Sequence, residues 1–238
     1  MQDEWTSAGA AYTRPFVYFA PTPMHRLSTI LGIAISAILT ALPAHAACDD
    51  YPQQLATQVS ADQALRARLD FSRMDDPDQK KLMQQMGIVD RANTAWLKAA
   101  FEQCGFPDKD KHGEKAQGNA WLLVQHADHD VAFQKYTLSL LEKMAAQRGE
   151  PVRRSFAYLA DRVAVAEKRP QLYGTQLMAP AEQPCNFDFN TMDDREKVEA
   201  RRAALGLPPL DIYKEMVLEN SNCAPPSASE SGSPPGRH

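Results

Sequence analysis

The sequence predicts a mainly α, compact helical domain with a minor β-hairpin or extended loop near residues 171–189, stapled by disulfides. Three observations lead to this fold class. Apolar residues recur at helical spacing over most of residues 53–169, glycine and proline mark the ends of the helical segments, and four cysteines follow residue 47.

The first half of the domain is expected to be helical throughout. The first helix covers about residues 53–70, and the second opens at Asp76-Pro77, because proline is tolerated in a first helical turn. Another covers about residues 91–104 and stops at Gly105.

Three further helices follow. Residues 114–126 form a helix that is apolar on every side over residues 120–124, so we expect it to be enclosed. Asp130 is placed to N-cap the next helix, which Gly149 ends, and Pro151 starts the one after it.

The pattern changes after Pro170. Residues 171–177 read as an extended segment or tight loop, and residues 185–189 alternate as in a short strand. A charged helix over residues 193–205 and a last short helix ending near Leu218 complete the domain.

Residues 24–46 have the features of a secretory signal peptide. A basic start precedes an uncharged apolar run over residues 30–42 and the small-x-small cleavage site Ala44-His45-Ala46. The run is shorter than the roughly 20 residues that a membrane span needs. We therefore expect cleavage after Ala46 and a soluble periplasmic or secreted protein with no membrane segment left.

The signal peptide divides the chain. Residues 1–23 read as an upstream start-site artefact, because acidic residues are unusual ahead of a basic n-region. Residues 47–223 are expected to form a single helical domain. Residues 224–238 are rich in proline, serine and glycine and are predicted to be a disordered tail.

Four cysteines in an exported chain indicate two disulfides. Of the three connectivities, we favour Cys48–Cys104 and Cys185–Cys223, since each closes a moderate loop. Lipidation of Cys48 is an alternative, although His45 stands where a lipidation site usually has an aliphatic residue.

Composition narrows the class of partner. The formal net charge of -4 argues against nucleic acid. The sequence contains no phosphate-binding loop, dinucleotide fingerprint or nucleophile motif, and its cysteines lack zinc spacing. We therefore expect no cofactor and no metal, and either an unknown protein partner or a small polar ligand.

The first candidate site lies at the end of the enclosed helix. Gln125, His126 and Asp128 stand where the core meets a loop. His126 is a candidate acid or base if a carboxylate orients it, and its spacing to His129 and Asp130 also matches helical metal ligands. The structural alternative is that His126 only bridges two helices.

The second candidate site combines a helix and the loop after it. Asp161 and Arg162 lie off the apolar stripe of their helix, and Tyr173, Thr175 and Gln176 surround a glycine. This pattern is typical either of a small-ligand site or of a tight loop fixed by side chains.

These segments also resemble a known family. The motifs W-L-L-V-Q-H-A-D-x-D, D-R, Q-L-Y-G-T-Q and R-R-x-x-L-G-L-P-P-L occur in that order within residues 97–213. Together they resemble an uncharacterised bacterial family, a domain of unknown function with a Tyr-Gly-Thr-Gln signature. The resemblance implies a mainly helical domain and brings no established reaction. It implies that one site is formed by Gln125, His126, Asp128, Asp161, Arg162, Tyr173, Gly174 and Gln176.

Two functions are compatible with these features. The first is an exported binding or interaction protein of inhibitor, immunity or envelope accessory type. The second is a hydrolase in which His126 is the acid or base, Asp128 or Asp161 orients it, and Arg162 holds an anionic group. An enzyme requires these side chains to converge, whereas a binding module would show them paired internally.

Overall fold

The computed structural model describes residues 46–149, 152, 154–180, 183 and 185–221. The expected upstream segment, nearly all of the signal peptide and the C-terminal tail lie outside these residues. Within them, the fold class predicted from the sequence is confirmed. The described residues form helices and one small antiparallel hairpin.

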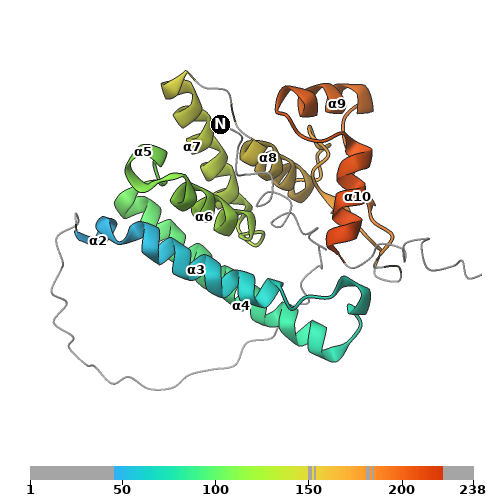
Figure 1. Cartoon of the computed structure of the whole chain (residues 1–238), viewed down its shortest axis with the longest axis horizontal. Coiled ribbons are helices and arrows are strands. Elements are labelled where there is room, and N and C mark those ends of the chain that lie inside the picture. The colour runs from blue at the N-terminus through green and yellow to red at the C-terminus, as the bar shows by residue number, and fades with distance from the viewer. Residues whose placement is uncertain (1–45, 150–151, 153, 181–182, 184, 222–238) are drawn as a thin grey trace, which may run out of the picture.

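The chain begins with a pair of antiparallel helices. A short helix, α2 (Ala46–Asp49), leads into α3 (Tyr51–Arg66), and a 3-10 turn over Phe71–Arg73 leads into α4 (Pro77–Cys104). Asp76 N-caps α4, because its side chain accepts a hydrogen bond from the Asp78 amide at 2.8 Å. Helices α3 and α4 lie side by side (Figure 1).

Helix α4 is continuous, and the expectation of separate helices from Asp76 and from residue 91 is wrong. Gly87 is the residue of lowest helix propensity near the expected break, and a single glycine costs about 1 kcal/mol relative to alanine. The buried face outweighs this cost because it runs without interruption from Leu82 through Asp90 to Phe101.

Three longer helices pack over this pair. They are α6 (Glu114–Gln125), α7 (Val131–Arg148) and α8 (Arg154–Ala166), and a short helix, α5 (Lys109–His112), precedes them. Asp130 N-caps α7, as expected from the sequence, by accepting from the Phe133 amide at 3.0 Å.

The C-terminal part carries the hairpin. Strands β1 (Leu177–Met178) and β2 (Asp188–Phe189) pair antiparallel, with Leu177 opposite Phe189. Helices α9 (Arg195–Ala204) and α10 (Leu210–Asn220) follow.

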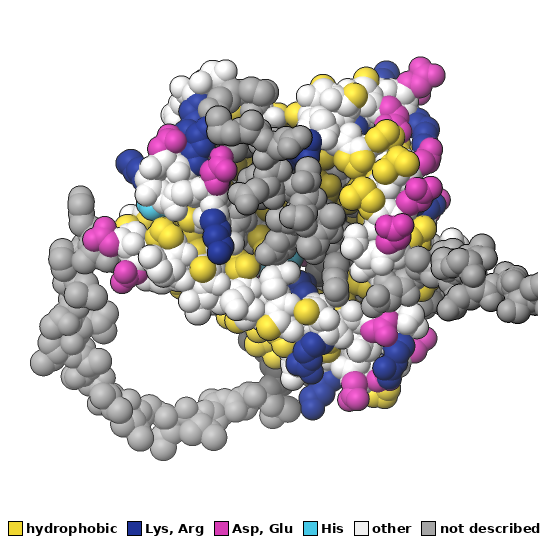
Figure 2. All heavy atoms as spheres, in the orientation of Figure 1, with side chains coloured by type: hydrophobic (Ala, Val, Ile, Leu, Met, Phe, Trp, Pro, Cys, Tyr) yellow, Lys and Arg dark blue, Asp and Glu magenta, His cyan; other side chains and the backbone are white. Residues whose placement is uncertain are grey.

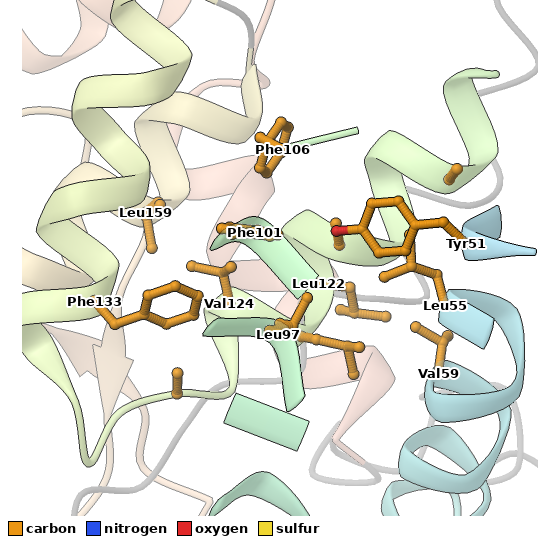
Figure 3. Close-up of a cluster of buried hydrophobic side chains, with 14 residues drawn as sticks. Tyr51, Leu55, Val59, Leu97, Phe101, Phe106, Leu122, Val124, Phe133 and Leu159 are labelled. Atoms are coloured by element: carbon orange, nitrogen blue, oxygen red, sulfur yellow. The ribbon is translucent and has the colours of Figure 1, made fainter. Parts of the chain in front are cut away.

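Among the described residues, buried apolar side chains gather in two clusters. The first lies between the start of α3, the end of α4 and helices α6 and α7 (Figure 3). It contains Tyr51, Leu55, Val59, Leu97, Phe101, Phe106, Leu122, Val124, Phe133 and Leu159. The second lies near the other end of α3 and α4 and contains Leu69, Phe71, Met74, Leu82, Met86, Leu177, Phe187, Tyr213 and Val217.

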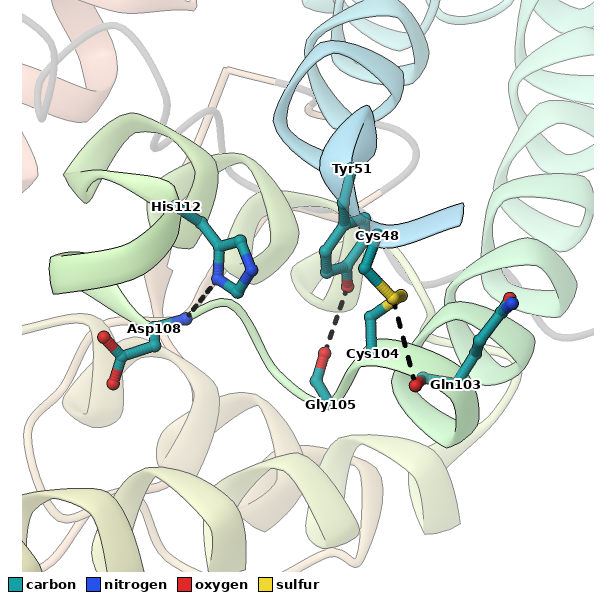
Figure 4. The surroundings of a disulfide bond; sticks show 7 residues. All are labelled: Cys48, Tyr51, Gln103, Cys104, Gly105, Asp108 and His112. Carbon is teal, nitrogen blue, oxygen red and sulfur yellow. Dashed lines mark hydrogen bonds between the residues drawn. A yellow bond between two sulfur atoms is a disulfide. The ribbon is translucent and has the colours of Figure 1, made fainter. Parts of the chain in front are cut away.

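A disulfide joins Cys48 and Cys104, as predicted (Figure 4). It ties α2, just before α3, to the end of α4. The Tyr51 hydroxyl donates to the carbonyl oxygen of Gly105 beside the disulfide at 3.4 Å. A sulfur held in this bond cannot also carry a lipid thioether, so the disulfide argues against lipidation of Cys48. The Cys185–Cys223 bond stays a prediction, because Cys223 lies outside the described residues.

The face seen in Figure 2 carries acidic and basic side chains interspersed over the helices rather than a basic patch. Within the described part of the chain, no helix is both long and apolar enough to cross a membrane.

Candidate functional site

A layer of buried polar side chains separates the two apolar clusters. On α3 it consists of Asp62 and Arg66, which lie between Val59 of the first cluster and Leu69 of the second. On α4 it contains Asp90, between Met86 and Leu97. We call these three residues, together with Gln125, His126, Asp128 and Arg162, the polar layer.

His126 is the centre of the polar layer. It follows the last residue of α6 and is 8% exposed. Its Nδ1 lies 3.0 Å from Oδ2 and 3.1 Å from Oδ1 of Asp62. The Nε of Arg66 lies 3.1 Å from both Asp62 Oδ1 and His126 Nδ1. Because a carboxylate only accepts, these contacts place the imidazole proton on Nδ1, where it is donated to Asp62.

The environment keeps this imidazole neutral. Burial and the neighbouring Arg66 charge lower the pKa of His126 to about 4, despite its hydrogen bond with Asp62. At neutral pH the lone pair therefore lies on Nε2. This atom has no hydrogen-bond partner among the described residues and is available as an acceptor.

Asp62 and Asp90 differ although both contact Arg66. Burial would raise the pKa of Asp62, but the hydrogen bond with His126 and the Arg66 charge lower it to about 2. Burial dominates at Asp90 and raises its pKa to about 7, even though Arg66 donates to it. The charges of Asp62 and Asp128 add to this rise. Asp90 is therefore the carboxyl group of the layer that titrates near neutrality.

Arg162 of α8 forms the other half of the layer. Its Nη1 lies 2.9 Å and 3.0 Å from the two carboxylate oxygens of Asp128, and its Nε donates to Gln125 Oε1 at 3.3 Å. Gln134 supports the pair by donating to Asp128 Oδ1 at 3.2 Å. Gln125 is 5% exposed, and its Nε2 is a buried donor without a partner. Such an orphan costs free energy unless a ligand or water satisfies it.

Asp161, next along α8, belongs to a different structure. It is fully buried and accepts hydrogen bonds from the backbone amides of Leu172, Tyr173 and Thr175 and from the Thr175 hydroxyl, at 2.7–3.2 Å. Burial raises the pKa of Asp161, and these hydrogen bonds oppose the rise. Its carboxylate therefore fixes the 171–176 loop, contrary to the expectation that it lies off the buried face of its helix.

The same loop is held from its other side. Arg202, 1% exposed, donates to the carbonyl oxygens of Tyr173 at 2.6 Å and Gly174 at 3.1 Å. Gln176 donates through Nε2 to the Tyr158 carbonyl oxygen at 3.4 Å and to the Thr175 hydroxyl at 3.0 Å. Tyr173 is half-buried. The loop thus matches the tight, side-chain-fixed alternative considered from the sequence.

The structure therefore brings some of the expected residues together and separates others. Gln125, Asp128 and Arg162 share one hydrogen-bonded group, and His126 is adjacent to it in the chain. Among the described residues, the carboxylate that hydrogen-bonds His126 is Asp62, rather than Asp128 or Asp161.

Sequence reasoning missed Asp62, Arg66 and Asp90. The signal that could have found them is their position on the core-facing side of each helix. Asp62 and Arg66 continue the buried face of α3 that begins at Tyr51, and Asp90 occupies an apolar position of α4. A charged residue at a core-facing position is a recognisable sign of a buried polar site.

The same cluster has the donor atoms of a metal site. Asp62, Asp90 and His126 offer atoms within 4.8 Å of one another. Arg66 donates to Asp62 and Asp90, and its Nε lies 3.1 Å from His126 Nδ1, so a guanidinium already supplies the positive charge between them. The donor set fits a bound cation only if Arg66 moves away.

Comparison with known proteins gives one match. The model of a family of unknown function, DUF6624, matches residues 49–223. No curated protein and no solved structure matches.

Proposed function

The chain belongs to the family of unknown function DUF6624, and we propose that it is an exported protein that binds a small polar ligand in the polar layer. The observation that carries this proposal is the layer itself. Asp62, Arg66, Asp90 and His126 are buried between two apolar clusters. Buried ion pairs stabilise a fold no better than apolar packing does, so their presence favours a role in recognition.

Unsatisfied groups in the layer support a ligand. The buried Nε2 of Gln125 lacks an acceptor, and Nε2 of His126 has no donor among the described residues. A bound molecule that accepts from Gln125 Nε2 would recover the desolvation cost of that buried donor, and a donor on the same molecule would be accepted by His126 Nε2.

Two features support export. The signal features end at Ala46, just before the family match begins at residue 49. The Cys48–Cys104 disulfide is typical of an oxidising compartment, such as the periplasm or the extracellular medium. Inhibitor, immunity and envelope accessory roles are all compatible with a binding site in such a protein.

Thermal denaturation with a ligand panel tests the proposal. The panel contains amino acids, amides, organic acids, sugars and divalent ions, and it is applied to the parent, His126→Ala and Arg162→Ala. We expect a ligand that raises the Tm of the parent but of neither variant.

The controls are His129→Ala and Arg169→Ala, because both side chains are exposed and outside the layer. They should respond as the parent does. If no panel member stabilises the parent, or if His126→Ala responds fully, the ligand proposal fails.

A hydrolase is the second candidate, and the Asp62–His126 contact favours it. An imidazole oriented by a carboxylate at Nδ1 with its Nε2 unoccupied is an arrangement used for general base catalysis. Binding remains the better-supported function, because a pKa of about 4 makes His126 a weak base at neutral pH. If the parent hydrolyses a member of a panel of esters, amides and phosphates and His126→Gln does not, hydrolysis becomes the better-supported function.

A further inference from the structure

Three side chains at the centre of the polar layer bring metal-ligating atoms together. Asp62 comes from α3, Asp90 from α4 and His126 from the residue after α6. One ligand atom of each lies within 4.8 Å of the other two, and all three residues are buried. Buried carboxylates are, as a rule, either paired with a cationic side chain or bound to a metal. This cluster therefore differs from the acidic groups of a solvated surface.

One edge of the cluster already has the spacing of a metal site. His126 Nδ1 lies 3.1 Å from Asp62 Oδ1. Two ligands that bind one zinc ion at about 2.0–2.2 Å lie about 2.8–3.6 Å apart in octahedral or tetrahedral geometry. Asp90 completes the set by moving about 2 Å or less, which is within reach of a change in its side-chain torsions.

An outer hydrogen bond orients one of the candidate ligands. Gln63 Nε2 donates to Asp62 Oδ2 at 2.6 Å, while Asp62 Oδ1 faces His126 and Arg66. Ligating carboxylates in metal sites are commonly held by such a second contact. The carboxylate of Asp62 is therefore fixed in direction before any ion arrives.

A guanidinium occupies the centre of the cluster in the described structure. Arg66 Nε lies 3.1 Å from both Asp62 Oδ1 and His126 Nδ1, and its Nη2 donates to Asp90. The three candidate ligands thus already converge on a cationic group. Arg66 is the last residue of α3, and the next two residues are exposed, so its long side chain has a path to solvent.

We propose that Asp62, Asp90 and His126 bind a divalent transition-metal ion such as Zn²⁺, with the Arg66 guanidinium displaced toward solvent. The imidazole ligand selects this class, because Mg²⁺ and Ca²⁺ prefer oxygen ligands alone. Three protein ligands leave a coordination position open, as in catalytic zinc sites. The inference goes beyond the proposed function, because it adds an ion-bound state of the layer.

Binding of the ion requires a change of tautomer at His126. In the described structure the imidazole proton lies on Nδ1 and is donated to Asp62. When Nδ1 binds the ion, this proton moves to Nε2 and the imidazole stays neutral. The position of the proton is therefore a signature that separates the metal-bound form from a hydrogen-bonded network.

Cobalt substitution and NMR test the proposal on the purified protein. Co²⁺ should develop visible absorption when it is added to the parent, and Zn²⁺ should displace it. The nitrogen resonances of the His126 ring should show the proton on Nδ1 without metal and on Nε2 with Zn²⁺. A network that only holds the fold would give neither result.

Arg66→Met is the critical variant, because it removes the competing cation. It should raise the affinity for Zn²⁺ at least about tenfold, equivalent to about 1.4 kcal/mol. Arg68→Met is the matched control, since Arg68 is exposed two residues further on, and it should bind as the parent does. In the Arg66→Met background, Asp90→Asn and His126→Gln should each lower the affinity at least about tenfold. Asp75→Asn, at a side chain that is 96% exposed, should leave it unchanged.

The contrary outcomes are distinct. If neither the parent nor Arg66→Met binds Co²⁺ or Zn²⁺, the proposal is wrong. Binding that survives both Asp90→Asn and His126→Gln would place the ion elsewhere and overturn it too. Where Arg66→Met fails to fold, the same two ligand variants in the parent background decide the question. The proposed function has its own readout, because an organic member of the thermal panel that stabilises the parent upholds ligand binding even when every metal titration is blank.

Discussion

The Nδ1 atom of His126 lies 3.0 Å from an oxygen of Asp62, although 64 residues separate the two in the chain. Arg66, one turn beyond Asp62, reaches both groups and also Asp90. A histidine between a carboxylate and a guanidinium, enclosed by two apolar clusters, makes the polar layer the most distinctive chemistry in the described structure.

Stability should depend on pH in two opposing ways. The pKa of Asp90 is about 7 rather than 3.8, so between these pH values the folded protein holds a proton that the unfolded chain has lost. The free energy of unfolding contributed by Asp90 therefore falls as pH rises. The pKa of His126 is about 4 rather than 6.5, so its contribution falls as pH drops through that window.

Single variants should separate the two effects. Relative to the parent, Asp90→Asn should lose stability on acidification from pH 6.5 to 4, because only the His126 effect remains. His126→Gln should gain stability on acidification from pH 7 to 4. Urea denaturation at several pH values measures both, and parallel pH profiles for parent and variants would contradict these assignments.

Asp161→Asn should loosen the 171–176 loop. The variant replaces one accepting oxygen with a donor that faces backbone amides, and it removes the charge that strengthens the remaining bonds. We expect a loss of about 2–4 kcal/mol in the free energy of unfolding. Asp193→Asn, which breaks a more exposed pair with Arg201, should cost much less. Equal losses would show that Asp161 does not hold the loop.

Gly174→Ala should be more harmful than a comparable glycine substitution elsewhere. Gly174 has φ +59°, and an added Cβ would lie 2.6 Å from Leu210 Cδ2. Gly149→Ala is the control, since φ is +62° there and no atom lies within 4 Å of the added Cβ. The control should cost about 1–2 kcal/mol, as expected for a left-handed residue, and Gly174→Ala clearly more. If Gly174→Ala and Gly149→Ala lower the Tm equally, the 171–176 loop does not pack closely against Leu210 of α10.

Removing the disulfide should destabilise the protein without altering the layer. The bond closes a loop with a sequence separation of 56, for which chain entropy predicts a contribution of about 4 kcal/mol. The double variant Cys48→Ser with Cys104→Ser should lose an amount of this order in chemical denaturation. The double variant should still bind whatever ligand the parent binds. Loss of binding at a temperature where the variant is folded would show that the disulfide also shapes the polar layer.

Local signals explain which parts of the fold are predictable from sequence. Asp130 caps α7 and Gly149 ends it through contacts within a few residues, so the pattern alone locates these ends. The division of α4 is a wrong prediction for the same reason. Gly87 has a low intrinsic helix propensity, which predicts a break at this point. Packing against α3 keeps α4 continuous in spite of that propensity.

The site is less predictable because its contacts are long-range. Sequence reasoning finds His126, Asp128 and Arg162 as chemically notable, but the partner of His126 comes from a helix 64 residues away. Asp161 and Arg162 are neighbours in sequence, yet one fixes a loop and the other joins the polar layer. Such a division depends on how α8 packs, which residue types alone do not reveal.

The central claim is that the charges of the polar layer serve recognition rather than folding. The most direct test is equilibrium unfolding of a variant with Asp62→Leu, Arg66→Met, Asp90→Leu and His126→Phe, which replaces the centre of the layer with apolar side chains. We predict a free energy of unfolding equal to that of the parent or higher by about 1–4 kcal/mol, with ligand binding lost. A variant that unfolds or loses about 3–5 kcal/mol would contradict the claim, because the layer would then be holding the fold together.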